Sequence, residues 1–515
     1  MTATARALVD PSFSLGEIDP RVYGSFVEHM GRCVYDGIYD PDHPTADEDG
    51  FRGDVADLVR ELGPTILRYP GGNFVSGYRW EDGVGPRADR PVRRDLAWKS
   101  IEPNLVGTNE FLRYCQRVAA EPMMAVNLGT RGIEAATALV EYTTLAEGSY
   151  WSDLRRSHGV AEPWDVRVWC LGNEMDGPWQ LGHKTAYEYG RLAAETAVAL
   201  RRVNPEIELV ACGTSKPVMP TFATWEAQVL EQCYSHVDYM SMHMYVDPDL
   251  ADDVPTLLAS GLEIDAYIDS VIAASDFARA AGKHSRPMPL SFDEWNVWYN
   301  SRPREIGVWP SAPELIGDIY SMADALVVGS FINSILRHSD RVRMACLAQL
   351  VNVIAPIRTE PGGGQAWRQS SFYPFALASR FGRGESLRVG LQAGRHDTAR
   401  HEDVPDLDVA AVRDPASGTL TFFVINRDLS NTIPLELALG GFTGFEAGAR
   451  IEHTVLTGPS AAATNSASQP DTVVPRAGRS GRWSGEAIAI EPLSWNMIRL
   501  HTATVGNTQS TSIHM

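Results

Sequence analysis

Short apolar runs alternate with longer helical patterns from residue 22 to about residue 350. Near-continuous apolar strands that alternate with helices predict a parallel sheet covered by helices on its outer face. Eight such repeats in a segment of this length predict an α/β fold in which the sheet closes into a (β/α)₈ TIM barrel. The eight predicted strands are residues 22–29, 65–70, 123–128, 166–172, 207–213, 237–243, 289–295 and 344–350.

The competing arrangement is an open, doubly wound sheet. Such a fold usually carries a glycine-rich, phosphate-binding turn after its first strand, and "FVEHMGRC" (26–33) is not one. A second glycine pair lies in "PGGNFVSG" (70–77), but this segment lacks the Lys-Ser/Thr ending of a P-loop. We therefore favour the barrel, and we expect these glycines to turn the backbone sharply and bring Asn73 into a site.

The pattern changes after about residue 385, where apolar residues recur at every second position. In "NTIPLELALGG" (431–441), four aliphatic side chains at alternate positions face one way. This period is typical of antiparallel strands and predicts a β-sandwich. We expect a catalytic barrel over residues 21–380, a sandwich over 381–502 and a disordered tail over 503–515.

Composition narrows the classes of partner. The formal net charge of −20 disfavours a nucleic-acid partner, which needs a basic surface, and is compatible with a neutral substrate. No signal peptide opens the chain and no apolar run could span a bilayer, so we expect a cytoplasmic protein without a membrane partner. Six scattered cysteines indicate buried thiols. Neither CxxC nor HExxH occurs, and we expect no metal and no cofactor.

Two glutamates close predicted strands in apolar or aromatic surroundings: Glu174 in "CLGNEMDG" and Glu294 in "SFDEWNVWY". Catalytic groups of such barrels lie at the C-terminal ends of the strands, and glycoside hydrolysis needs two carboxyl groups that flank the scissile bond. Glu81, Asp82 and Asp293 are rival carboxylates, although strand alternation is expected to turn Asp293 to the opposite face. The other polar residues at strand ends are Glu28, Arg68, Asn73, Asn127, Asn173, Ser215, His243, Tyr245 and Gln349.

These residue types suit a sugar, whose C–H faces stack on indoles and whose hydroxyl groups need amide and carboxylate partners. Trp298 follows the second glutamate closely. His243 and Tyr245 could be metal ligands or packed core groups. We favour a third role, in which they position Glu294 by hydrogen bonds, with simple packing as the alternative.

One lysine offers a different chemistry. Lys216 lies three residues past the fifth predicted strand and could form a Schiff base, as in an aldolase-type barrel. Pro217 and Pro220 follow it closely, and this placement disfavours a catalytic amine.

Seven long motifs are distributed along the chain, and the similarity to a known family that they support runs from about residue 5 to residue 502. They are "VYGSFVEHMGRCVYDGIYD", "LRYPGGNFVSGYRWEDGVGPR", "LAWKSIEPNLVGTNEF", "WCLGNEMDGPWQ", "SMHMYV", "SFDEWNVWY" and "AQLVNVIAPI". Together they resemble the α-L-arabinofuranosidases of glycoside hydrolase family 51.

This resemblance implies a retaining exo-hydrolase that removes terminal α-L-arabinofuranosyl groups from arabinan, arabinoxylan or their oligosaccharides. By matching position, Glu174 resembles the acid/base and Glu294 the nucleophile. Asn173 is expected to hydrogen-bond the 2-hydroxyl of the sugar. The positions at which the family holds the furanose and its neighbours are Glu28, Arg68, Asn73, Trp98, Asn173, Tyr245, Trp298 and Gln349.

The resemblance also implies an N-terminal segment, residues 1–20, that completes the β-sandwich, and a homo-oligomer that in this family is often a hexamer. Two alternatives stay open at this point. One is another (β/α)₈ glycosidase such as an endo-glucanase, which would need an open groove instead of a short pocket. The other is a non-catalytic sugar-binding barrel. Linkage preference and aglycone preference do not follow from the sequence.

Overall fold

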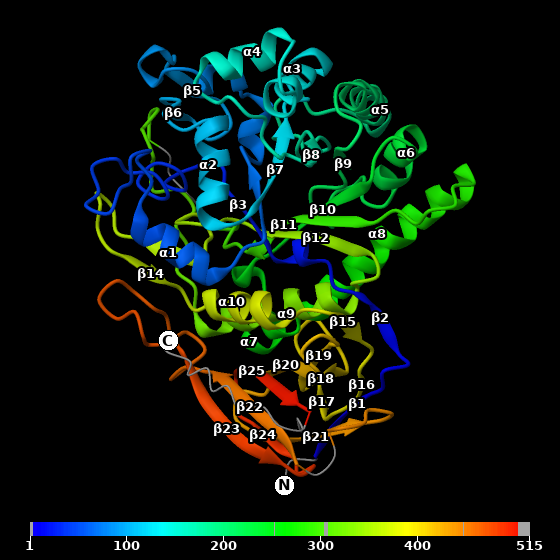
Figure 1. Cartoon of the computed structure of the whole chain (residues 1–515). Coiled ribbons are helices and arrows are strands. Elements are labelled where there is room, and N and C mark those ends of the chain that lie inside the picture. The colour runs from blue at the N-terminus through cyan, green and yellow to red at the C-terminus, as the bar shows by residue number, and fades with distance from the viewer. Residues whose placement is uncertain (1–3, 252, 303–306, 446–447, 503–515) are drawn as a thin grey trace.

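Eight parallel strands close into a barrel in the computed structural model, which describes residues 4–251, 253–302, 307–445 and 448–502 (Figure 1). Each strand pairs with the next one along the chain, and the last pairs with the first, which confirms the predicted fold class. The predicted tail, 503–515, lies outside the described residues. The barrel strands are β3 (Gly24–Phe26), β4 (Ile66–Tyr69), β7 (Glu121–Val126), β8 (Val168–Leu171), β9 (Glu208–Ala211), β10 (Tyr239–Val246), β11 (Leu290–Val297) and β12 (Val342–Leu347).

At least one α-helix follows every barrel strand. Helix α5 shows how the sequence starts them: the Thr185 side chain accepts the N–H of Glu188, and the Glu188 carboxylate accepts the N–H of Thr185. No helix of the described chain is both long and apolar enough to cross a membrane. The helices are α1 (Gly53–Leu62), α2 (Thr108–Val118), α3 (Ile133–Thr144), α4 (Tyr150–Ser157), α5 (Ala186–Val203), α6 (Thr224–Cys233), α7 (Val254–Leu258), α8 (Ser260–Gly282), α9 (Met322–Arg337) and α10 (Phe372–Phe381).

Two further sheets lie below the barrel in Figure 1. The four-stranded sheet has the order β16-β1-β21-β24, and the seven-stranded sheet has the order β2-β15-β19-β20-β25-β22-β23. The N-terminal segment supplies one strand to each of them. Their strands are β1 (Ala5–Val9), β2 (Ser14–Glu17), β15 (Glu385–Leu387), β16 (Gly390–Gln392), β19 (Leu407–Asp414), β20 (Thr419–Asn426), β21 (Ile433–Leu439), β22 (Ala449–Leu456), β23 (Pro475–Trp483), β24 (Ile488–Ile490) and β25 (Ser494–His501).

Three pairs of short strands, each strand two or three residues long, lie in the loops of the described chain. The pair β5 with β6 matters for the site because Trp98 lies in the turn between its strands. The pairs are β5 (Arg93–Asp95) with β6 (Ser100–Glu102), β13 (Ile357–Thr359) with β14 (Ala366–Arg368), and β17 (Arg395–His396) with β18 (Val404–Pro405).

The seven-stranded sheet buries both of its faces. Along β20, Phe422 and Val424 pack between the two sheets, whereas Phe423 and Ile425 pack toward the barrel. Helix α9 contacts β19, β20 and β25 on that inner side. A strand buried on both faces has no polar alternation, which explains the apolar run of β20. We propose a domain boundary near residue 380, at the end of α10.

Candidate active site

A cavity of about 460 Å³, open to solvent, lies at the C-terminal ends of the barrel strands. Most of the side chains predicted for the site line it, while Arg68, Asn173 and His243 lie buried around its floor. The predicted residues that line the cavity are Glu28, Asn73, Trp98, Glu174, Tyr245, Glu294, Trp298 and Gln349.

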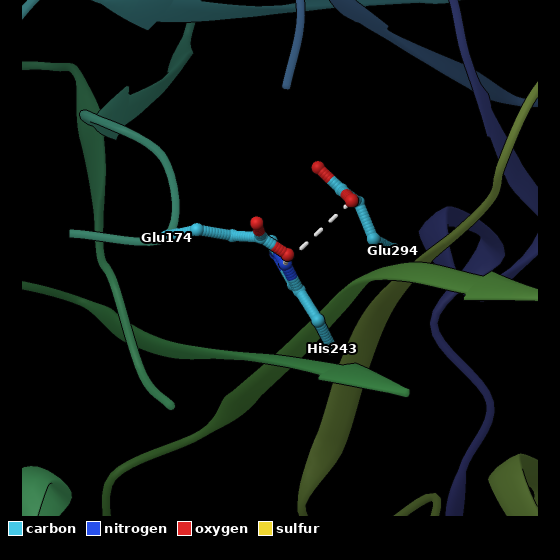
Figure 2. A group of neighbouring side chains, drawn as sticks. All are labelled: Glu174, His243 and Glu294. Carbon is cyan, nitrogen blue, oxygen red and sulfur yellow. Dashed lines mark hydrogen bonds and ion pairs between the residues drawn. The ribbon is translucent and has the colours of Figure 1, made fainter. Parts of the chain in front are cut away.

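Glu174 and Glu294 approach each other from opposite sides with the His243 imidazole between them (Figure 2). Glu174 follows β8, Glu294 lies on β11 and His243 lies on β10. One oxygen of each carboxyl group and a ring nitrogen of His243 all lie within 4.8 Å of one another. Glu174 has a φ of 44°, in the left-handed region, a strained conformation that is common at functional sites.

Glu294 is held from two sides. Arg68 donates from Nη1 to Oε1 of Glu294 at 2.7 Å, and the Tyr245 hydroxyl donates to Oε2 at 2.9 Å. The same guanidinium donates from Nη2 to Oδ1 of Asn173 at 2.7 Å. Arg68 therefore fixes the relative positions of the glutamate on β11 and of the asparagine that precedes Glu174.

Glu174 accepts hydrogen bonds at both oxygens. The indole Nε1 of Trp179 donates to Oε2 at 2.7 Å, and Nδ1 of His243 lies 3.1 Å from Oε1. His243 is farther from Glu294, at 3.6 Å from Oε2. The expected role of His243 is therefore only partly correct, because its hydrogen bond goes to Glu174 and only its charge reaches Glu294.

Asp293 corrects another expectation. It faces the interior of the barrel instead of the opposite side of β11, with Oδ1 3.3 Å from Nε2 of His243 and Oδ2 3.4 Å from Nε of Arg68. The Ser241 hydroxyl also donates to it. The register of β11 shifts between Phe292 and Trp295, so regular alternation fails where both acidic residues lie.

Burial and charge oppose each other in this cluster. Burial raises the pKa of Glu294, and the charges of His243 and Arg68 offset only part of that rise. Burial disfavours a charged imidazole, but the carboxylates of Glu294, Asp293 and Glu174 outweigh it and raise the pKa of His243 to about 10. In the free site the pKa of the Glu294 carboxyl is therefore raised, with burial as the main cause.

Glu28 organises the other side of the cavity. Its carboxylate accepts hydrogen bonds from the N–H of Phe74 at 2.9 Å, Nε1 of Trp98 at 2.8 Å and Nε2 of Gln349 at 3.0 Å. A Cβ on Gly72 would lie 2.4 Å from Glu28 Oε2, so this glycine permits the close approach. Burial, and then the charge of Glu294, raise the pKa of Glu28 to about 8.

Comparison with known proteins agrees with this geometry. Residues 58–259 match the family model described as "Alpha-L-arabinofuranosidase 1 domain", and residues 293–494 match "Alpha-L-arabinofuranosidase C-terminal domain". An intracellular exo-α-(1→5)-L-arabinofuranosidase of Bacillus subtilis is 52% identical over 500 residues, which cover 96% of this chain and 99% of that protein. The chain belongs to the α-L-arabinofuranosidases of glycoside hydrolase family 51.

Two relatives from Bifidobacterium longum extend the comparison. An exo-α-(1→6)-L-arabinofuranosidase is 49% identical over 449 residues, covering 85% of this chain and 86% of that protein. The solved structure of a family 51 α-L-arabinofuranosidase is 43% identical with a TM-score of 0.92, and the match covers 97% of this chain and 100% of that one. The enzyme is accordingly an exo-α-L-arabinofuranosidase that acts on terminal arabinofuranosyl residues.

The rival residues take structural roles in this arabinofuranosidase. Glu81 pairs with Arg131 at 2.6 Å, and Asp82 pairs with Arg93 at 2.8 Å. Asn127 caps its own loop by accepting the N–H groups of residues 129 and 130. None of the three carboxamide or carboxylate groups lines the cavity.

Glu174, His243 and Glu294 form the one group in the described chain whose ligand atoms lie close enough to hold a metal ion. Its hydrogen bonds fit hydrolysis better than a metal centre. The imidazole nitrogen bonds to Glu174, and the guanidinium of Arg68 already supplies a positive charge to Glu294. A cation at this point would also meet a charged imidazole.

Sequence reasoning missed Trp179 in the arabinofuranosidase site and considered Lys216 only as a Schiff-base lysine. Trp179 bonds to Glu174, yet it lies on a turn five residues later and carries no periodic pattern. Lys216 lines the cavity with its Nζ 4.7 Å from the centre of the Trp179 ring, so it lies at the mouth rather than on the floor. The motif "GNEMDGPWQ" held the only indication of Trp179, a tryptophan five residues after the candidate glutamate.

Proposed function

We propose that the enzyme is a retaining hydrolase in which Glu294 is the nucleophile and Glu174 the acid/base. The observation that carries the proposal is the short approach of the two carboxyl groups, with an oxygen of each within 4.8 Å of the other. Retaining glycosidases hold these groups about 5–5.5 Å apart, whereas inverting enzymes need about 6.5–9.5 Å to admit a water. The approach found here lies below the separation that inverting enzymes use, and this supports a retaining mechanism.

The first step forms a bond between a Glu294 oxygen and the anomeric carbon while the glycosidic bond breaks. Glu174 gives a proton to the departing oxygen. In the second step Glu174 takes a proton from water, and the water oxygen displaces Glu294 from the anomeric carbon. Arg68 and Tyr245 aim Glu294 and stabilise its charge when it leaves.

The proton delivered by Glu174 comes, in this proposal, from His243. The Nδ1 of His243 lies 3.1 Å from Glu174, and the carboxylate of Asp293 lies 3.3 Å from its Nε2. The raised pKa of His243 keeps the ring protonated at neutral pH. Transfer from Nδ1 to Glu174, and on to the leaving oxygen, leaves a neutral imidazole that the second step reprotonates through Glu174.

The sugar is expected to lie against Trp98 and Trp298, with its hydroxyl groups on Glu28, Asn73 and the other amides around the cavity floor. We expect Asn173, which accepts a hydrogen bond from Arg68, to hydrogen-bond the 2-hydroxyl, where contacts strengthen in the transition state. A cavity of this kind suits one terminal furanose, whereas an internal segment of a polysaccharide would need an open groove. This favours an exo-acting enzyme over an endo-glucanase, and the close approach of two glutamates in the cavity disfavours a non-catalytic barrel.

The substrates proposed are arabinan, arabinoxylan and arabino-oligosaccharides. The relatives named for α-(1→5) and for α-(1→6) linkages are 52% and 49% identical to this chain. Hydrolysis rates on oligosaccharides of each linkage would determine which linkage this enzyme prefers. The name of the Bacillus relative includes "intracellular", and this supports a cytoplasmic location. A homo-oligomer, a hexamer by family resemblance, stays a prediction.

The anomer released first tests the mechanism. Proton NMR of a 4-nitrophenyl α-L-arabinofuranoside digest, recorded before mutarotation, should show the α-anomer of arabinofuranose. Initial release of the β-anomer would mean that water attacks directly and that Glu294 is not a nucleophile. An aryl arabinofuranoside that is not cleaved at all would instead contradict the substrate assignment.

A further inference from the structure

A lysine stands at the mouth of the cavity, where the mechanism gives it no task. Only four lysines occur in the chain, at positions 99, 184, 216 and 283, among 45 basic residues. Lys216 follows β9 and lines the cavity. Its ammonium forms a cation–π contact with Trp179, and no described residue supplies a carboxylate partner.

The position of this ammonium relative to the reaction follows from Trp179. The indole Nε1 is bonded to Oε2 of Glu174 at 2.7 Å, and the ring is 42% exposed. In the proposed function Glu174 protonates the oxygen of the leaving group, so this ring borders the leaving-group side of the cavity. The present inference rests on that assignment.

Lys216 changes what the leaving group meets there. A sugar that stacks on an indole needs a free ring face, but the ammonium occupies one face of Trp179. The acidic side chains that line the cavity are Glu28, Glu174 and Glu294. Lys216 is therefore the only cation among the described lining residues, and it lies on the side away from the furanose.

We propose that Lys216 selects arabinofuranosides whose leaving group carries a carboxylate, as a uronic acid residue does. The chain as a whole is strongly acidic and repels anions at long range. Charges are screened beyond about 8 Å at physiological salt, so a cation in contact with the leaving group still acts locally. Lys216 would then offset the repulsion between the acidic protein and an anionic leaving group, at the side of the cavity where that leaving group lies.

A pair of matched substrates tests this proposal. We would compare 4-(carboxymethyl)phenyl with 4-(carbamoylmethyl)phenyl α-L-arabinofuranoside, which differ in charge but have similar leaving groups. The wild-type ratio of kcat/KM, carboxylate over amide, should fall by about 3- to 5-fold in Lys216→Met, as expected for one partly exposed ion pair. Lys216→Arg should keep the ratio, and 0.5 M NaCl should lower it in the wild type.

Lys283→Met is the control, because it removes the same charge from the end of α8, outside the cavity. It should leave the ratio unchanged. Equal losses on both substrates in Lys216→Met would overturn the proposal, since the ammonium would then only support Trp179 and Glu174. A wild-type enzyme inactive on both substrates would instead contradict the proposed function.

Discussion

Replacing Asp293 with asparagine should move the basic limb of the pH profile. Asp293 lies 3.3 Å from Nε2 of His243, and its carboxylate is one of the charges that raise the pKa of the ring to about 10. Asparagine has the same shape and can still accept a hydrogen bond, so the change removes charge more than contact. A less strongly held proton on His243 means that the acid supply to Glu174 fails at lower pH.

The size of the shift follows from the geometry. Two unit charges 3.3 Å apart interact by about 5 kcal/mol at an effective dielectric constant of 20. At 1.36 kcal/mol per pKa unit this sets an upper limit of about 3 to 4 units. In Asp293→Asn the retained hydrogen bond and the charges of Glu174 and Glu294 still hold the pKa of His243 above its usual value. We expect the basic limb to fall by about 1 to 2 units.

The assay compares two aryl arabinofuranosides across pH 4 to 11. A phenyl leaving group needs the proton, so kcat/KM should show the shifted limb, whereas 2,4-dinitrophenolate leaves without it and should show little shift. Asp238→Asn is the control, because Asp238 pairs with Arg201 at 2.5 Å at the opposite end of β10. An unchanged limb in folded Asp293→Asn would refute the role given to His243.

The same charge predicts a change in stability. A raised folded pKa means that protonated His243 stabilises the fold fully below its unfolded pKa of about 6.5, and that this contribution disappears as pH rises through about 10. In Asp293→Asn the loss should occur at lower pH. The thermal unfolding midpoints of the wild type and of Asp293→Asn should therefore differ more at pH 7 than at pH 10.

The remaining predictions concern the two glutamates. Glu294→Ala should fold normally, by circular dichroism, and lose at least about 10⁴ in rate because no covalent intermediate can form; near-wild-type turnover would contradict the assignment. Glu174→Ala should slow arabino-oligosaccharide hydrolysis far more than glycosyl-enzyme formation from an activated aryl substrate, and azide should restore its breakdown; equal losses without rescue would place the acid/base elsewhere. Because burial raises the pKa of Glu294, the acidic limb of kcat/KM should lie above about 4.3, the usual glutamate value, and a limb below it would contradict this effect of burial.

The fold was predictable because its pattern is periodic. All eight barrel strands fall on the predicted apolar runs, since a strand buried on both sides must be apolar along its whole length. The N-terminal strands β1 and β2 could be placed only by resemblance. Nothing in their short sequences indicates that one pairs with β21, more than 400 residues away, and the other with β15.

The site was predictable in its members but not in its contacts. Glu174 follows the end of β8 and Glu294 lies in the C-terminal half of β11, and the barrel brings the C-terminal ends of its strands to one mouth. The partner of each carboxylate depends on loop geometry: Trp179 reaches Glu174 from a turn, and Asp293 turns inward where β11 shifts its register. Such shifts come from packing against neighbouring strands, which a period-two pattern does not contain.

The inward turn of Asp293 has an electrostatic reason. Two cations, Arg68 and protonated His243, lie among three carboxylates, Asp293, Glu174 and Glu294, so the buried cluster carries one net negative charge. In the proposed first step Glu294 loses its charge by forming an ester, and His243 loses its charge by supplying the proton. The net charge therefore stays the same while both groups react. Without Asp293, the free cluster would be neutral in total but its imidazolium would lose a direct partner, and a buried charge that loses its partner is costly. Asp293 is thus the constant counter-charge against which the other groups exchange protons and bonds.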